Sequence, residues 1–264
     1  MSYNNAFQAI CQIQKEWAQA NGIAVDSHGY TCDGKDNLYE SLDAEVVNEL
    51  AAGRGDELEK KIRALHSSSA LVCNVFHYWR YRSVDSIAKI CGCPGGMNSL
   101  LFESKHNIQK NRFPAHLDLE FRGPNLRPTG VESKFTEPYN RGLKKLNPFY
   151  RDNRLWVGLP RCGSLADTII NGKEKYYRFD APQLLKHILG MKTKYSKDFE
   201  LVYLWYKYES EETEEHNIEM CRFQEYLDGE INCRTLTYQK IFEEIRRCPY
   251  AEPSYVTYLE RRYF

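Results

Sequence analysis

Two short segments of alternating apolar and charged residues most constrain the fold of this 264-residue chain. The first is AHLDLEFRG, from Ala115 to Gly123, and the second is GVESKF, from Gly130 to Phe135. Strict alternation predicts two β-strands, because successive side chains of a strand point to opposite faces. The link GPNLRPTG carries two Gly and two Pro, which favours a chain reversal and an antiparallel pair.

Alternation also predicts which side chains share a face. In the first strand we expect Leu117, Leu119 and Phe121 on one face, and Asp118 and Glu120 on the other. The second strand has the same form. It places Val131, Ser133 and Phe135 on one face, and Glu132 and Lys134 on the other.

Antiparallel pairing would bring Asp118, Glu132 and Lys134 together, with Glu120 nearby. Carboxylates are hard oxygen ligands that hold Mg²⁺ or Mn²⁺. Such a metal polarises a phosphoryl group and acidifies water, while an ammonium orients the nucleophile or offsets negative charge. The pattern therefore suits hydrolysis of a phosphodiester. The alternative is a hairpin that faces solvent, with cross-strand ion pairs worth under about 1 kcal/mol each.

The rest of the chain indicates an α/β fold with a helical N-terminal portion. Apolar spacing predicts helices in much of residues 1–66, including the residues around Leu38, Leu42 and Leu58 to Leu65. Further strands are expected in LLFESKHNI, ELVYLWYKY and EINCRTLTY, and further helices over 84–90, 181–195, 221–227 and 238–247. The acidic run over 208–217 is expected to be a solvated loop or a helix start. We expect one domain over 1–264, with a mixed-sheet core over 67–264.

Pro114 and Asp118, followed by Gly130-Val131-Glu132-Ser133-Lys134-Phe135, resemble the PD-(D/E)XK core of the restriction-endonuclease-like nuclease superfamily, specifically its bacterial putative restriction endonucleases. The resemblance spans roughly residues 57 to 140. It implies a mixed β-sheet flanked by helices and metal-dependent hydrolysis of nucleic acid. By the same resemblance, Asp118 and Glu132 would bind the metal, the Ser133 main-chain carbonyl would be a further ligand, and Lys134 would be the catalytic lysine.

Three further residues are candidate auxiliary groups: Glu103, Glu120 and Gln183. Glu103 begins a second Glu-Ser-Lys, but the later copy is preferred because Asp118 lies upstream of it on the strand expected to pair with it. Exposure to solvent is the alternative for Glu103. Gln183 stands near the start of an expected helix, where an ordinary amphipathic pattern also explains it. The histidines, including His77, His116 and His187, lack H-x-x-x-H or H-x-H spacing, so no zinc hydrolase is expected.

A basic segment follows the candidate strands. Residues 141–161 interleave basic residues with Phe149, Tyr150 and Trp156, a composition that suits contact with phosphates and exposed bases. A basic surface loop with its aromatic side chains in the core explains the segment as well. The candidate nucleic-acid-binding residues are Lys144, Lys145, Arg151 and Arg154.

Overall composition adds little to this hypothesis. Lys plus Arg equals Asp plus Glu at 36 each, so any site for a polyanion must come from local clustering. No apolar run approaches the length of a membrane span, and the first residues lack the order of a secretory signal. We expect a cytoplasmic protein with no membrane partner, whose nine cysteines are reduced thiols.

The sequence therefore predicts a Mg²⁺- or Mn²⁺-dependent endodeoxyribonuclease of restriction or defence type, with double-stranded DNA as the expected substrate. Two alternatives stay open: a catalytically inactive nucleic-acid-binding or assembly module of the same fold, and a phosphoesterase that acts on small nucleotides. An enzyme that cuts both strands of a palindrome would be expected to form a twofold homodimer.

Overall fold

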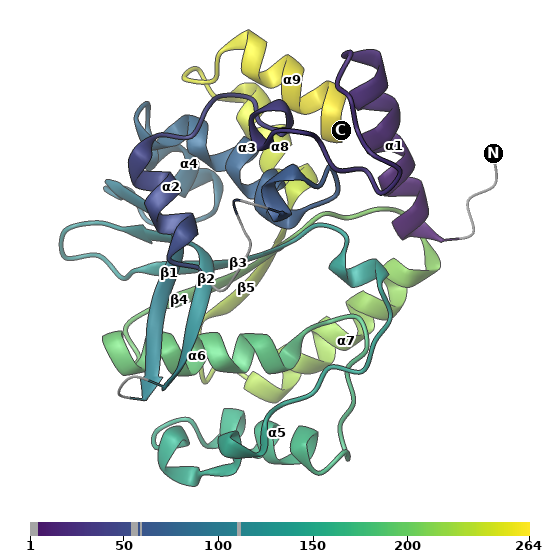
Figure 1. Cartoon of the computed structure of the whole chain (residues 1–264). Coiled ribbons are helices and arrows are strands. Elements are labelled where there is room, and N and C mark those ends of the chain that lie inside the picture. Colours follow the sequence, from purple (N-terminus) through teal and green to yellow (C-terminus); the bar gives the residue numbers. More distant parts are fainter. Residues whose placement is uncertain (1–4, 54–57, 59, 110–111) are drawn as a thin grey trace.

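The computed structural model describes residues 5–53, 58, 60–109 and 112–264. Within them a single five-stranded mixed sheet runs through the middle of the molecule (Figure 1). Its strands are β1 (Ser99–Gln109), β2 (Arg112–Arg122), β3 (Thr129–Lys134), β4 (Glu200–Trp205) and β5 (Cys233–Thr237). The strands stand in sequence order. β1, β2 and β3 are antiparallel neighbours, whereas β3, β4 and β5 are parallel.

Helices cover both faces of the sheet (Figure 1). On one face lie α5 (Pro160–Ile170), α6 (Ala181–Tyr195) and α7 (Glu211–Leu227). On the other lie α1 (Ala6–Ala20), α2 (Ala44–Ala51), α3 (Ser68–Arg80), α4 (Val84–Ile90), α8 (Tyr238–Arg247) and α9 (Pro253–Tyr263). Both layers are needed because the parallel strand β4 is apolar along almost its whole length. The α/β class and the helix-flanked mixed sheet are confirmed.

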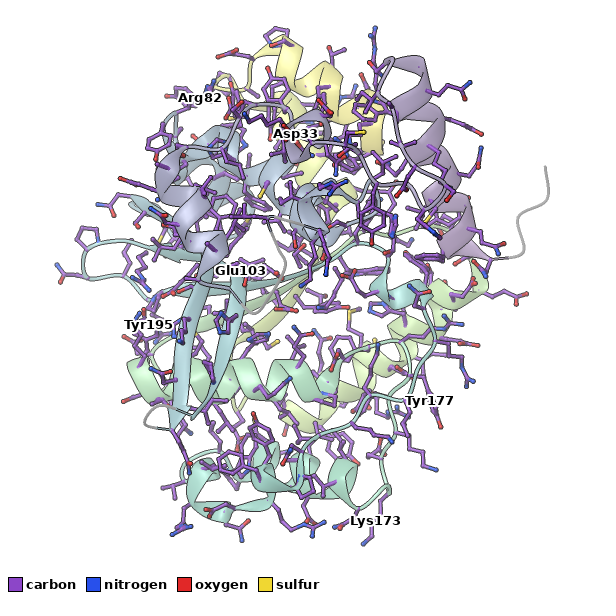
Figure 2. All side chains as sticks on the ribbon, viewed as in Figure 1. Asp33, Arg82, Glu103, Lys173, Tyr177 and Tyr195 are labelled. Carbon is purple, nitrogen blue, oxygen red and sulfur yellow. The ribbon has the colours of Figure 1, made fainter. Side chains whose placement is uncertain are left out.

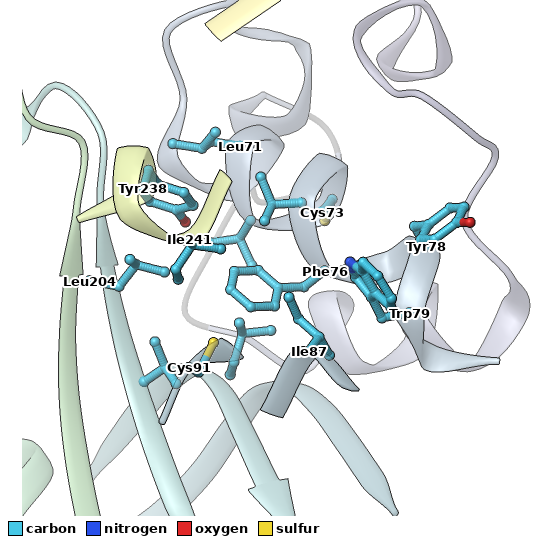
Figure 3. Close-up of a cluster of buried hydrophobic side chains, with 14 of the residues drawn as sticks. Leu71, Cys73, Phe76, Tyr78, Trp79, Ile87, Cys91, Leu204, Tyr238 and Ile241 are labelled. Atoms are coloured by element: carbon cyan, nitrogen blue, oxygen red, sulfur yellow. The ribbon is translucent and has the colours of Figure 1, made fainter. Parts of the chain in front are cut away.

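The core between the sheet and α3 is built around Phe76, which is fully buried. Figure 3 shows its ring among Ile87 of α4, Ile241 of α8 and Leu204 of β4. Burying an aromatic side chain of this size contributes about 1.5–3 kcal/mol. This core fixes the position of the sheet face that lies opposite the candidate site.

The second core, between the sheet and α6, contains Leu185 and Tyr203, and also Leu117 of β2. The expectation that Leu117 shares a face with Leu119 and Phe121 is therefore wrong, since those two pack in the α3 core. The side-chain direction changes near Asp118, and the same change occurs in β1 around the opposite residue.

The opposite residue is Glu103, which lies between the pairs Phe102–Leu119 and Ser104–Leu117. Its φ of 46° is left-handed, a rare conformation for a residue with a side chain. Phe102 packs in the α3 core, whereas Ser104, His106 and Ile108 face the α6 side. The left-handed residue interrupts the alternation, which is why a strict period of two fails here.

The N-terminal portion contains less helix than its apolar spacing predicts. α1 and α2 form, but Leu38 and Leu42 lie outside helices, and over 58–65 only the short 3-10 helix Lys61–Arg63 appears; residue 59 lies outside the described residues. Asp26 and Asp33 accept hydrogen bonds from main-chain N–H groups two residues on, which favours turns over helix. The other 3-10 helices are Gly34–Asn37, Glu137–Tyr139, Pro148–Arg151 and Asn153–Trp156.

Several other boundaries agree with the sequence. The helices over 84–90, 181–195 and 238–247 begin and end as expected, and Thr237 caps α8 by accepting a hydrogen bond from the Lys240 N–H. The acidic run begins α7 after the N-cap Ser210, as its helix-start alternative expects, and the helix continues through the expected segment 221–227. All nine cysteines are free thiols. No described helix has the length and apolar character required to cross a membrane.

Candidate active site

Asp118 and Glu132 meet where β2 and β3 begin to separate. The two strands pair at Leu119–Val131, so the next positions toward this end are Asp118 and Glu132. The Ser133 main-chain N–H donates to Asp118 Oδ2 over 2.6 Å. The aspartate is thereby fixed beside β3 through its side chain, as the antiparallel pairing predicts.

Glu132 is almost fully buried, with 1% of its side chain exposed, and each of its two oxygens faces a different group. Lys134 Nζ lies 2.5 Å from Oε1, and His187 Nε2 lies 2.8 Å from Oε2. Lys134 also donates to Gln183 Oε1 over 2.9 Å. Glu132, Lys134, Gln183 and His187 therefore form one contiguous polar cluster.

Helix α6 supplies two members of this cluster because of how it begins. Asp180 accepts a hydrogen bond from the Gln183 N–H as N-cap, and Pro182 occupies the first turn, where no donor is needed. Gln183 and His187 are four residues apart, so they lie on the same side of the helix. That side faces the charged side chains of β3.

The charges of the cluster act on one another. Burial alone would raise the pKa of Glu132, but Lys134 and His187 lower it to about 2. Burial and the neighbouring carboxylates of Glu132 and Glu103 raise the pKa of Asp118 well above its ordinary value. Burial by itself would lower the pKa of Lys134, but the surrounding carboxylates outweigh this effect and raise the pKa above its ordinary value. The site thus keeps an ionised Glu132 beside a cationic Lys134.

Glu103, a candidate auxiliary residue, belongs to the same neighbourhood. It lies opposite Asp118, and its carboxylate is close enough to raise the pKa of Asp118. A Cβ built on Gly53, which follows α2, would meet Glu103 Oε2 at 3.0 Å. The side chain is half-buried under this segment rather than fully in solvent, and Figure 2 shows it beside α2.

Glu120, the third candidate auxiliary residue, is engaged elsewhere. It is fully buried and accepts hydrogen bonds from Arg122 and Tyr195, with His106 Nε2 2.9 Å away. Tyr195 ends α6, and Figure 2 places it at a different position along the β1–β2 hairpin from Glu103. The expected proximity of Glu120 to Lys134 does not appear among its contacts.

The donor atoms present suit a hard divalent cation. Glu132 Oε2 is buried, and apart from its ion pair with His187 it has no aligned hydrogen bond, although buried polar atoms normally have one. Asp118, Glu132 and the Ser133 carbonyl offer the oxygen ligands that Mg²⁺ and Mn²⁺ take. In the described part of the chain, no three His, Cys, Asp or Glu side chains are already gathered as a metal-binding cluster. These residues therefore offer ligands that suit a cation, but they do not form a complete set of ligands by themselves.

The basic segment over 141–161 connects β3 to α5 and contains two short 3-10 helices. Arg151 and Arg154 are exposed, but Arg154 is held by Asp152, and Arg151 donates to Asn171 over 2.5 Å. Lys145 is exposed and Lys144 half-buried. Tyr150 and Trp156 are buried, so these rings pack in the core, as the alternative interpretation of this segment expects.

His187 is the residue of this site that the sequence analysis missed. Its spacing from the other histidines matches no zinc motif, so the sequence pattern gives it no role. The available signal was its position four residues after Gln183 on a helix already expected to pass near the site.

A comparison with protein families agrees with this architecture. The family model described as "Restriction Endonuclease associating with ARP" matches residues 12–264. No curated protein and no solved structure matches the chain. The match covers the sheet, the helices on both of its faces and the whole cluster around Glu132. The chain therefore belongs to this restriction-endonuclease family.

Proposed function

We propose that the protein is a metal-dependent endonuclease that hydrolyses phosphodiester bonds, with double-stranded DNA as substrate. The observation that carries the proposal is the juxtaposition of Asp118, Glu132 and Lys134 at the separating ends of β2 and β3. Membership of a restriction-endonuclease family supports the same class of reaction.

Each residue has a role that follows from its contacts. Asp118, Glu132 and the Ser133 carbonyl would hold Mg²⁺ or Mn²⁺, which when bound polarises a phosphoryl oxygen and lowers the pKa of water. Lys134 keeps its proton because carboxylates surround it, so it acts as a cation and not as a base. Gln183 holds the ammonium in place. A positive charge fixed at this point stabilises the negative charge that develops on the phosphate.

Substrate contact would extend beyond the polar cluster. We assign Lys144, Lys145, Arg151 and Arg154 to the phosphate backbone, because the segment that carries them follows β3 directly. Phosphate contacts of this kind raise affinity without selecting sequence. A twofold dimer would present two such sites to the two strands of a duplex.

The test compares cleavage of plasmid, linear duplex, single-stranded DNA and RNA in Mg²⁺ or Mn²⁺. Glu132→Ala and Lys134→Ala should each lower the cleavage rate by at least about 100-fold, since each removes charge from the reacting centre. Lys173→Ala, at an exposed lysine far from the cluster (Figure 2), is the matched control and should cut like the wild type. Equal rates in all four proteins would disprove the assignment.

A second candidate function is an inactive nucleic-acid-binding or assembly module of this fold. It is favoured by the engagement of both Glu132 oxygens with side chains of the protein itself. The two functions differ in one measurement: a wild-type protein that binds nucleic acid as tightly as Lys134→Ala but cuts none of the four substrates would be such a module.

A further inference from the structure

His187 is a buried histidine that faces the central carboxylate of the candidate site. Its side chain is 3% exposed, and its Nε2 faces Glu132 Oε2 at 2.8 Å. Neither ring nitrogen has an aligned hydrogen bond within the described part of the chain, and the facing carboxylate oxygen has none either. Leaving a buried polar atom unpaired costs about 1–3 kcal/mol. Nε2 and Oε2 contact each other as an ion pair without the geometry of a hydrogen bond, so both atoms remain able to bind a further partner.

The separation of the two facing atoms fits that partner being a cation. Neighbouring ligands of an octahedral ion with metal–ligand distances of about 2.1 Å lie about 3 Å apart. The 2.8 Å between His187 Nε2 and Glu132 Oε2 is close to this value. Asp118 and Glu103 add negative charge beside the pair, as the raised pKa of Asp118 reflects.

Resting on the proposed function, we infer that His187 is a nitrogen ligand of the divalent cation held by Glu132, and that this ligand makes the site prefer Mn²⁺ to Mg²⁺. Mg²⁺ favours an all-oxygen shell, whereas imidazole suits transition metals, whose affinity for nitrogen is higher. Asp118 and the Ser133 carbonyl complete the protein's share of the ligands. Because His187 lies in the middle of α6, the cation would be bound by the helix as well as by the sheet.

A second buried histidine provides a matched control. His77 of α3 is 6% exposed in its side chain and lies between two carboxylates, with Nε2 2.9 Å from Asp43 and Nδ1 3.3 Å from Glu40. It has the same combination of burial and acidic neighbours, on the opposite face of the sheet. His77→Gln makes the same chemical change as His187→Gln at a buried histidine, but outside the candidate site.

The experiment is electron spin-echo spectroscopy of Mn²⁺ bound to the wild type, His187→Gln and His77→Gln, each labelled with ¹⁵N-histidine, together with calorimetric titration by Mn²⁺ and by Mg²⁺. The wild type should show coupling of manganese to a histidine nitrogen. His187→Gln should lose this coupling and about tenfold in Mn²⁺ affinity, with Mg²⁺ affinity nearly unchanged. His77→Gln should keep both.

The outcomes separate this inference from the function on which it rests. If the wild type binds Mn²⁺ and cuts DNA without any nitrogen coupling, His187 is not a ligand, but the nuclease assignment survives. Coupling that persists in His187→Gln or disappears in His77→Gln would also overturn the inference. A wild type that neither binds a divalent cation nor cuts nucleic acid would overturn the proposed function together with it. A wild-type spectrum without nitrogen coupling overturns the inference by itself, so this outcome does not depend on a variant that folds.

Discussion

At the scale of single residues, the two acidic side chains of the candidate site have opposite effects on the folded state. Glu132 is stabilised as a carboxylate by Lys134 and His187. Asp118 is buried beside two other carboxylates, so its ionised form is disfavoured. A functional site of this kind holds charge that the fold alone would avoid.

This difference predicts stability changes of opposite sign at pH 7. Asp118→Asn should raise the free energy of unfolding by about 1 kcal/mol, because it removes repulsion and keeps an acceptor for the Ser133 N–H. Glu132→Gln should lower it by about 2–4 kcal/mol, since Lys134 loses its buried partner. Urea denaturation measures both, and both variants should lose cleavage.

The pH dependence follows from the same pKa shifts. The folded-state pKa of Glu132, about 2, lies below its ordinary 4.5. Its contribution to stability is therefore fully present above pH 4.5 and is lost as the pH falls toward 2. Asp118 has a raised pKa, so its protonated form adds stability at low pH that is lost as the pH rises. Asp118→Asn should gain most over the wild type at neutral pH, and a gain that is the same at pH 4 would contradict this account.

At the scale of secondary-structure elements, the site depends on how closely α6 packs on the β1–β2 hairpin. Gly190 permits the contact: a Cβ built on it would meet the His106 Cβ at 2.8 Å and the Ala115 Cβ at 3.0 Å. The glycine lies one turn beyond His187 on the same helix. The distance between helix and sheet therefore sets the position of both His187 and Gln183.

Gly190→Ala should destabilise the protein by about 1–3 kcal/mol through overpacking, although alanine favours a helix by about 1 kcal/mol. Cleavage should fall further than stability explains, because α6 is displaced from β3. Gly142→Ala is the control, since nothing lies within 4 Å of a Cβ built there. Thermal unfolding and cleavage at a temperature where all three proteins are folded test the expectation; an unchanged Gly190→Ala would refute it.

The sequence could predict these elements to different degrees. α6 and α8 have clear caps and strong apolar periodicity, so their bounds are readable from local chemistry. The pairing of Asp118 with Glu132 follows from a period of two and one reversal. The change of side-chain direction at Glu103 and the approach of His187 depend on tertiary packing, which no local pattern contains.

At the scale of the whole molecule, a buried arginine joins segments that are distant in sequence. Arg262 of α9 is 1% exposed and donates to the main-chain oxygen of Asn37 over 2.8 Å, and its guanidinium stacks 4.3 Å from the Trp17 ring. Its partners are carbonyls, hydroxyls and aromatic rings. It thereby fastens α1 and the loop around Asn37 to α9.

Arg262→Met should lower the free energy of unfolding by about 2–4 kcal/mol, because buried Asn37 Oδ1 loses its donor and the Asn37 main-chain oxygen keeps only the Asn74 amide. Arg261→Met, one residue away and exposed, should change it by less than about 0.5 kcal/mol. Denaturant midpoints give both values. Limited proteolysis should cut Arg262→Met first between α1 and α2, and cleavage elsewhere first would show that the arginine does not hold this segment.

The same arginine has a consequence for the order in which the chain folds. Its α9 reaches Gln14 of α1 across 248 positions of sequence, as the hydrogen bond from the Gln14 amide to the Arg262 carbonyl shows. Closing so long a loop is entropically costly before other contacts exist, whereas the β1–β2 hairpin needs only its neighbours. We expect the hairpin to pair early and the joining of α1 to α9 to come late. During synthesis, α1 would then remain unpacked until α9 has been made, whereas the strands between them already pair.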